Sequence, residues 1–466
     1  MMAQILTDLN DFLWSQALVV LLIAVGGVFT VGSGFVQVRY FPRMFRVLTT
    51  GMRHESGYIS SFQALTLSVA GRVGSGNIAG VAVAITLGGP GAVFWMWVIG
   101  LLGMATSFFE CSMAQLYKRT RSEVGFIGGP AYYLLHGVGS RKLAVIYSIL
   151  LLVTFGIGMV VVQAYVVAES VQATFGIEDW SVALLMVFVL SLTVLGGVSR
   201  IAAVAQWIVP LMSLAYFLVA LIVVITNIQS IPDILMYIVR SAFGIDSAIG
   251  GGFGVAIMHG VRRGLFSNEA GMGSAPNVAA IARVRHPIDQ GIVQSLSVFI
   301  DTMIICTSTA LVILLSDVYQ PQADNIEGIV LTQNALAAHV GWWGSAFVSI
   351  ALVLFAFTSI LYNFYMGESG IVFLVKDSKK AIFAFRMVAL GLVFWGSLQS
   401  MEMVFGISDL TMGLLALVNL IGLIFLYQSG LRLLQDYDKQ LKRGIQPNFD
   451  PLKWSDLDID RTAWRR

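Results

Sequence analysis

The stretch GRVGSGNIAG, residues 71–80, holds four glycines, an arginine and an asparagine inside a run that is otherwise apolar enough to cross a membrane. Glycine costs roughly 1 kcal/mol against alanine inside a helix, and a charge at the bilayer centre costs at least about 2.5 kcal/mol. Unwinding also frees backbone N–H and C=O groups, which is tolerated only where the break is buried in protein or lines a cavity. The stretch therefore predicts a discontinuous membrane helix whose freed backbone groups bind a ligand.

The composition places the whole chain in a lipid environment. Of its 466 residues, 57% are hydrophobic and 12% are charged, whereas soluble proteins carry about 25% charged residues. The basic residues form short clusters between apolar runs, with no continuous stripe for nucleic acid. The two cysteines and five histidines show no metal-ligand spacing, which argues against an intramembrane enzyme.

Membrane-spanning helices need about 20 mostly apolar residues. By this rule we predict an all-α integral membrane protein with eleven spans. They are expected at 12–38, 60–87, 91–117, 143–175, 180–198, 202–226, 248–282, 287–316, 342–374, 381–399 and 407–429.

The distribution of charge predicts the orientation of these spans. Clusters of Lys and Arg begin at Arg39, Lys118, Arg200, Arg283 and Lys376, in alternate connections, whereas the opposite connections are mainly acidic. Because cytoplasmic loops are enriched in Lys and Arg, we expect an external N-terminus and a cytoplasmic C-terminus.

A second glycine-rich interruption, HGVRRGLFSNEAGMGSAPN, occupies residues 259–277 in the seventh predicted span. Spans 2–6 and 7–11 form two sets of five, and the first helix of each set is the interrupted one. Five helices per half make the second half enter from the opposite side, which is an inverted repeat with a substrate site near the midplane. The alternative is that these glycines serve only close helix packing.

This repeat gives the domain boundaries that we expect. A peripheral helix with an interfacial segment covers 1–59, the first five-helix repeat covers 60–226, and the second repeat with its connecting external loop covers 227–429. The remaining residues, 430–466, carry mixed charges and are expected to form a solvated cytoplasmic tail.

At GRVGSGNIAGVAVAITLGGPGAVFWMWVIG (71–100) and RGLFSNEAGMGSAP (263–276) the sequence strongly resembles the alanine or glycine:cation symporters, also called the sodium:alanine symporter family. The likeness runs from the second predicted helix to the eleventh. Members of this family are similar to LeuT-type transporters, which have ten core helices in a 5+5 inverted repeat. The resemblance implies that fold, preceded here by one peripheral helix, in a bacterial or archaeal plasma (inner) membrane.

The resemblance also implies a sodium site built from oxygen ligands, as a hard cation prefers. The matching positions are backbone carbonyls on two helices and two hydroxyls on the ninth predicted helix, namely Ala70, Val73, Phe355, Thr358 and Ser359. The alternative for each hydroxyl is a hydrogen bond back to its own helix.

The substrate site implied by the resemblance draws on both breaks and on the fourth predicted helix. The matching residues are Ser75, Gly76, Asn77, Gln163, Phe266, Ser267 and Asn268. An interhelical hydrogen bond is an equal alternative for Gln163. Arg72 and Tyr165 depart from the family pattern, in which many members carry a small hydroxyl residue and an asparagine.

Three charged residues near the middle of their spans are expected to form a structural network: Arg72, Glu269 and Asp301. Charged residues inside a membrane normally face the bundle interior and pair with one another. We therefore expect Arg72 to pair with Asp301 or Glu269, with capture of a substrate carboxylate as the alternative.

Taken together, the sequence predicts a sodium-coupled symporter of alanine and glycine that works by alternating access and is not an enzyme. Its partners would be an amino acid, sodium and the lipid bilayer, with no nucleic acid and no cofactor other than the coupling ion, and a monomer is the default. A glutamine-preferring or proton-coupled carrier of the same family is the alternative. A channel and an intramembrane enzyme are the rivals from other classes.

Overall fold

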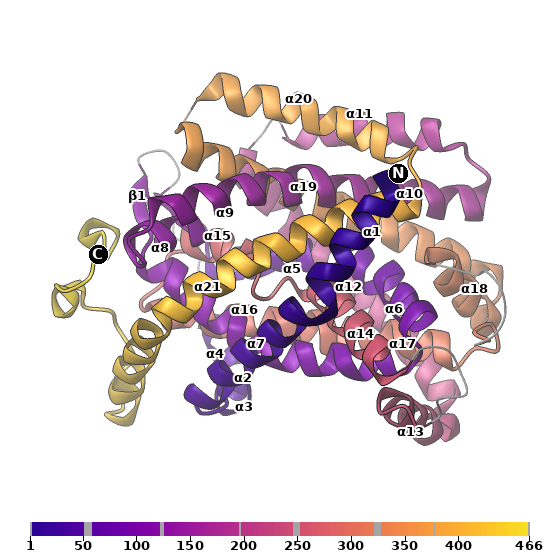
Figure 1. The fold of residues 1–466 in the computed structure, drawn as a ribbon, viewed down its shortest axis with the longest axis horizontal. Coiled ribbons are helices and arrows are strands. Elements are labelled where there is room, and N and C mark those ends of the chain that lie inside the picture. Colours follow the sequence, from indigo (N-terminus) through magenta and orange to yellow (C-terminus); the bar gives the residue numbers. More distant parts are fainter. Residues whose placement is uncertain are drawn as a thin grey trace.

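The structure is a computed structural model and describes residues 2–50, 58–121, 125–194, 197–245, 252–320, 328–376 and 378–464. Apart from one short hairpin, the described elements are helices (Figure 1). The N-terminal helices precede the first break and are α1 Met2–Phe12, η1 Leu13–Ala17, α2 Leu18–Gly32, α3 Val36–Arg39 and α4 Phe41–Thr50.

The next part of the chain runs from the first broken helix to a long helix that contains Pro210. Its helices are α5 Ser61–Arg72, η2 Gly76–Gly80, α6 Val81–Gly88, α7 Gly91–Leu116, α8 Pro130–His136, α9 Arg141–Val153, η3 Thr154–Met159, α10 Val160–Phe175, α11 Asp179–Val194 and α12 Gly197–Thr226. The hairpin joins β1 Arg119–Arg121 to β2 Gly125–Ile127 in antiparallel register, with Thr120 opposite Phe126.

The remaining part contains the second broken helix and the longest helices. It comprises η4 Ile228–Ser230, α13 Ile231–Ala242, α14 Phe253–Asn268, α15 Ser274–Ile281, α16 Pro287–Val298, η5 Phe299–Cys306, α17 Thr307–Leu314, α18 Ile329–Val340, α19 Trp342–Val375, α20 Lys379–Gly396, α21 Met401–Lys442, η6 Pro451–Trp454 and η7 Arg461–Trp464. Of these elements η1, η2, η3 and η5 are π-helical turns.

Helices overlie every predicted span, but length and hydropathy support fewer crossings than eleven. Among the described residues, six helices are long and apolar enough to cross a membrane, and a bent pair, α5 with η2 and α6, makes a seventh. The count of eleven spans and the inverted repeat stay predictions. Helices α13 and α18 were not predicted, because each has only 12 residues and falls below the length of a span.

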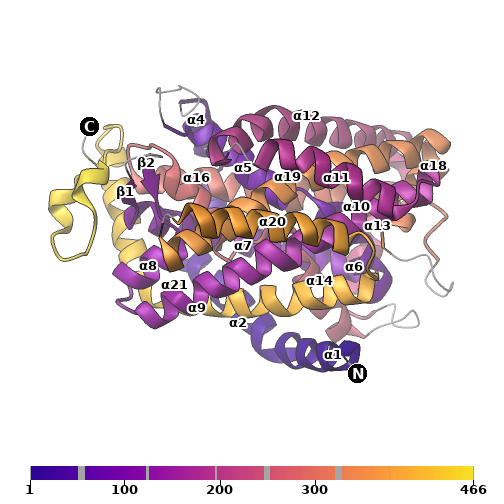
Figure 2. The same cartoon turned by 90° about the horizontal axis from the view of Figure 1, so that it is seen from above.

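The elements gather at two opposite ends of the molecule. Figures 1 and 2 place α4, β1, α8 and the end of the chain toward one end, and α13 and α18 toward the other. Between these ends, α11 and α12 expose large apolar side chains such as Phe188 (62% exposed) and Trp207 (77% exposed). Such a band of exposed apolar surface suits contact with lipid tails.

The first break begins and ends where the residue types require. Ser60 caps α5 by accepting a hydrogen bond from the backbone of Gln63, whose side chain bonds back to Ser60, and such a capping box fixes the helix start. The helix ends at Arg72, because Val73 is extended (ψ 92°). Beyond the break, the helix formed by η2 and α6 is bent by 51° from α5.

The second break needs residues that tolerate positive φ. Helix α14 ends at Asn268, and Glu269 then takes a left-handed conformation (φ 54°), followed by Gly271 (φ 96°) and Gly273 (φ 81°). A non-glycine residue seldom adopts this conformation unless its surroundings hold it there. Helix α15 then restarts at Ser274.

The C-terminal segment differs in part from the expectation. Helix α21 continues past Gly430 to Lys442, and the segment after it packs against the body of the protein. Phe449, Trp454, Ile459 and Ala463 are all buried. Most of the other residues after α21 are exposed, as expected of a solvated tail. The burial of these apolar residues was not predicted, because they are spaced among charged ones with no helical or strand period that would have indicated it.

Candidate functional site

The first break is held open by hydrogen bonds to its freed backbone. The Gly74 N–H donates to Asn77 Oδ1 at 2.9 Å, and the Ser75 N–H donates to Gln163 Oε1 at 3.2 Å. Gln163 comes from α10, so it makes the interhelical hydrogen bond that was the alternative to substrate contact. This bond also places its amide at the point where the helix is unwound.

The second break lies directly against the first. A Cβ atom on Gly76 would lie 2.9 Å from the Phe266 ring and 3.2 Å from Ser267 Cα, so only glycine allows this approach. Asn77 Nδ2 donates to Ser267 Oγ at 3.1 Å. The two breaks, about 190 residues apart in the chain, thus form one polar centre.

A buried carboxylate completes this centre. Asn77 Nδ2 donates to Asp301 Oδ1 at 2.6 Å, whereas the hydroxyls of Ser267 and Thr302 donate to Oδ2, each at 2.8 Å. Asp301 and Thr302 come from the π-helical turn η5 and are fully buried. Within the described ranges no lysine or arginine pairs directly with Asp301, so neutral donors stabilise its charge.

The expected sodium ligands are only partly brought together. Ser359 Oγ on α19 donates to the Ala70 carbonyl at 2.8 Å, which joins two of the five predicted ligands. Thr358 Oγ1 bonds back to the Phe355 carbonyl of its own helix at 3.0 Å, the alternative considered for it. Val73 is buried beside them, with its N–H bonded to Val69.

Asn268 lies apart from the other expected substrate residues. Its Oδ1 accepts a hydrogen bond from the Ala270 N–H at 2.9 Å and faces Gly103 of α7. Asn268 Nδ2 is buried without a hydrogen-bond partner in the structure. The described contacts of Asn268 therefore shape the second break and do not reach Ser75, Gly76 or Gln163.

Arg72 does not make the ion pair that we expected. Its guanidinium donates to the Gln294 carbonyl (3.1 Å), to Ser107 Oγ (3.0 Å) and to Ser297 Oγ. Across the part of the chain that the structure describes, no carboxylate lies within ion-pair distance of it. Glu269 and Asp301 are close enough to interact electrostatically with it, but α7 and α16 supply its hydrogen bonds.

Two further residues, Tyr362 and Asp409, bond to charged groups beside the breaks and were not predicted. Tyr362 donates to Glu269 Oε2 at 3.3 Å and covers Gly71; its position three residues after Ser359, on the same face of α19, could have indicated it. Asp409 contacts Arg262 Nη2 at 2.7 Å and also pairs with Arg263. Nothing in the spacing of these residues links α14 to α21.

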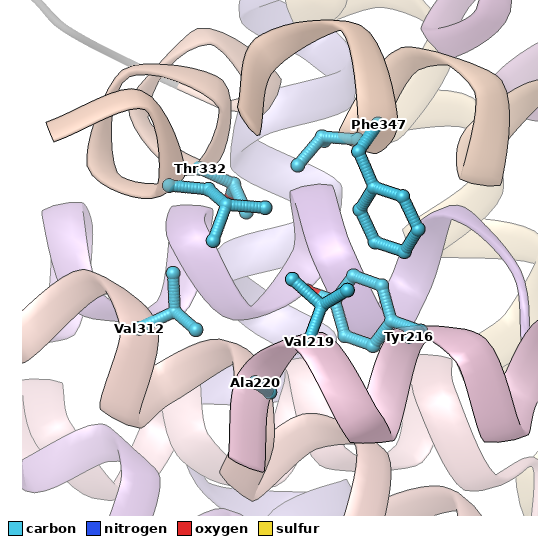
Figure 3. Close-up of a pocket in the computed structure, with 8 residues that line it drawn as sticks. Tyr216, Val219, Ala220, Val312, Thr332 and Phe347 are labelled. Atoms are coloured by element: carbon cyan, nitrogen blue, oxygen red, sulfur yellow. The ribbon is translucent and has the colours of Figure 1, made fainter. Parts of the chain in front are cut away.

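A separate apolar pocket lies among α12, α17, α18 and α19 (Figure 3). The labelled residues that line it are Tyr216, Val219, Ala220, Val312, Thr332 and Phe347. It contains none of the expected substrate or sodium residues. Thr332 links it to the first break, because its hydroxyl donates to the Ile78 carbonyl at 3.4 Å.

Two discontinuous helices that meet in a polar centre, inside a bundle of apolar helices, define a membrane transporter. Comparison with known proteins identifies the family of transporters. The sodium:alanine symporter family matches this chain over residues 1–451, and the chain belongs to that family.

Curated relatives agree with this assignment, and a solved structure shares the fold. The chain is 45% identical to the probable sodium/glutamine symporter GlnT of Bacillus subtilis, over 94% of this chain and 91% of that protein. It is 46% identical to the amino-acid carrier protein AlsT of the same organism, over 94% and 93%. A manganese transporter of Eremococcus coleocola shares the fold, with a TM-score of 0.51, 13% identity and coverage of 83% and 81%.

Proposed function

We propose that this transporter couples the movement of sodium to uptake of a small neutral amino acid, with alanine and glycine as the preferred substrates, by alternating access. One observation carries the proposal. A Cβ atom on Gly74 would lie 2.6 Å from Ser359 Oγ and 3.0 Å from Gln163 Nε2. The expected sodium hydroxyl and the expected substrate amide therefore converge on one unwound residue, which allows one site to respond to the other.

The neighbouring residues favour a neutral substrate. Freed backbone groups at the breaks suit the carboxylate and ammonium of an amino acid. Ser75, Gly76, Asn77, Phe266 and Ser267 supply small, neutral or aromatic surfaces around them. Asp301 is already bonded to Asn77, Ser267 and Thr302, and burying a further charge without a partner costs several kcal/mol.

Glutamine is the second candidate. The Gln163 amide at the break offers a donor and an acceptor, which match the side-chain amide of glutamine. The relative named as a probable sodium/glutamine symporter supports this candidate.

Uptake by the purified protein in proteoliposomes tests the proposal. We expect a sodium gradient to drive accumulation of labelled alanine, and unlabelled glycine or glutamine to compete with it. Glutamate and lysine should compete at least tenfold less well. Equal competition by a charged amino acid contradicts the neutral site, and equal accumulation without sodium leaves proton coupling as the explanation.

Replacing Ser359 by Ala is expected to raise the sodium concentration for half-maximal uptake several-fold, because the change removes one oxygen ligand. The matched control is Ser369→Ala on the same helix, whose hydroxyl donates to the Tyr365 carbonyl at 2.9 Å. The control should keep the sodium dependence of the wild type. If Ser359→Ala keeps it too, the sodium site lies elsewhere.

The orientation belongs to the same proposal. We place the N-terminus outside and the C-terminus in the cytoplasm of a bacterial or archaeal plasma membrane, with eleven spans and a 5+5 inverted repeat. The support is that α4, β1 and α8, which carry or adjoin basic clusters, lie toward one end (Figures 1 and 2). A periplasmic reporter that is active when fused after Arg466 contradicts this orientation.

A further inference from the structure

Residues 443–464, here called the tail, form a packed unit although they follow the last membrane helix. Phe449 is at the centre of this unit, with its ring 5.7 Å from Trp454 and 4.7 Å from Trp464. Both Phe449 and Trp454 are 3% exposed. The tail therefore has its own small aromatic core, and its charged residues face neighbouring elements.

One side of the tail is attached to the hairpin and to α8. Asp458 lies 3.0 Å from Arg119 Nη2 and 2.6 Å from His136 Nδ1. The Thr120 N–H donates to Asp460 Oδ2 at 2.8 Å, and the hydroxyls of Thr120 and Thr462 are 2.9 Å apart. Burial raises the pKa of Asp458, but the hydrogen bonds from His136 and Arg119 hold that pKa below its usual value.

The other side of the tail is attached to the segment that follows α15. The Phe449 N–H donates to the Arg285 carbonyl at 2.9 Å, and the Arg285 side chain donates to Gln446. The same segment is bonded to the residue before α5, because the Arg283 N–H donates to the Ile59 carbonyl at 3.1 Å. The tail therefore adjoins the place where the outer ends of α5 and α15, one half-helix from each break, are joined.

Lys118 shows how closely the tail fits. It is 1% exposed, and its ammonium lies 4.0 Å from the Phe126 ring centre and 4.1 Å from that of Trp464. Burial, together with the nearby Arg283, lowers the pKa of Lys118 to about 7. The aromatic faces of the hairpin and the tail enclose this amine, so moving the tail away would expose it.

We propose that the tail is a latch that holds this end of the protein closed and slows the transport cycle. Alternating access needs one repeat to move relative to the other around the substrate site. The tail spans from β1 and α8 to the segment after α15, so that segment cannot separate from the hairpin while both attachments hold. The latch rests on the transport cycle of the family and not on which amino acid is carried.

Loosening one attachment should speed transport. We expect Asp458→Ala to raise the maximal uptake rate about two- to fivefold, because exposed ion pairs change equilibria by about that factor. The matched control is Asp456→Ala, since Asp456 pairs with Arg432 of α21 and does not reach the hairpin. An uptake rate that is unchanged or lower in Asp458→Ala, or equally raised in the control, overturns the latch.

Locking the tail should stop transport. The paired change Thr120→Cys and Thr462→Cys places two thiols where the hydroxyls are 2.9 Å apart, and the native Cys111 and Cys306 are buried. We expect oxidation with copper phenanthroline to cross-link the tail and to lower uptake at least tenfold, with recovery on reduction. The single change Thr120→Cys, oxidised in the same way, should transport normally.

Two results overturn the latch in this second experiment. Either no cross-link forms in the resting protein, or the cross-linked protein transports as fast as the same protein after its disulfide has been reduced. The cross-link is read from mobility on a gel without any substrate. A wrong choice of amino acid would abolish uptake in every variant and leave the cross-link unchanged, so failure of the substrate proposal is distinguished from failure of the latch.

Discussion

Replacing Asp409 by Asn is expected to destabilise the protein by about 3–5 kcal/mol, the usual cost of removing one partner of a buried ion pair. Asp409 pairs with both Arg262 and Arg263, and the three side chains are 3%, 11% and 4% exposed. The change removes the charge but keeps the shape, so it leaves two buried guanidinium groups without a counter-ion. The measurement is the thermal unfolding midpoint in detergent, which should fall by several degrees.

Two comparisons identify the cause of this loss. Asp456→Asn removes an exposed pair with Arg432, whose side chains are 54% and 48% exposed, and should leave the midpoint unchanged. Adding Arg262→Gln to Asp409→Asn removes one of the uncompensated charges and should recover part of the loss. A variant Asp409→Asn that unfolds at the wild-type temperature would show that the carboxylate does not compensate these arginines.

Replacing Gly74 by Ala is expected to reduce uptake at least tenfold while the protein still folds. The added Cβ would lie 2.6 Å from Ser359 Oγ and 3.0 Å from Gln163 Nε2, closer than side chains normally approach. Ser359 would be displaced from the Ala70 carbonyl, so the sodium concentration for half-maximal uptake should rise as well. A tenfold loss corresponds to about 1.4 kcal/mol, which a methyl group in a packed site readily imposes.

The control for this change is Gly80→Ala in the π-helical turn η2, which follows the break. A Cβ on Gly80 would meet Phe266 at 3.7 Å and the Ser75 carbonyl at 4.0 Å, which are ordinary contacts. We expect normal uptake from this variant and a single symmetric peak from both variants in size-exclusion chromatography. Wild-type uptake by Gly74→Ala would contradict the proposal that the close approach of Ser359 and Gln163 to Gly74 is needed for transport.

The breaks were predictable because their residues are unfavourable in a helix, and this unfavourable helix propensity can be recognised from the sequence. Glycines around Asn77 and around Glu269 are unfavourable in a membrane helix, so both breaks could be located without a structure. Resemblance to the family then added Gln163 and Ser359, and the structure places both against Gly74. That these residues bind substrate and sodium stays a prediction.

The partners of the buried charges were not predictable, because they depend on packing between distant helices. Its depth in the membrane suggested that Arg72 would pair with a carboxylate, but it forms hydrogen bonds with Ser107 on α7 and Ser297 on α16 instead. The pairing of Asp409 with Arg263 joins residues 146 positions apart, and no periodic pattern in either helix indicates it. Unfavourable helix propensity indicates where a helix breaks, whereas the residues that contact a buried charge can be identified only when the fold is known.

The number of residues in the π-helical turn η5, Phe299–Cys306, determines how the side chains at the polar centre are oriented. A π-helical turn holds one residue more than an α-helical turn, and one residue corresponds to a rotation of about 100°. Deleting any one residue between Val298 and Thr307 would let the helix become regular, but it would turn Asp301 or Thr309 away from its partner. Asn77 would lose the Asp301 carboxylate, or Tyr216 would lose the Thr309 hydroxyl that lies 2.7 Å away. Point substitutions in η5 can keep this geometry, but a change of length cannot.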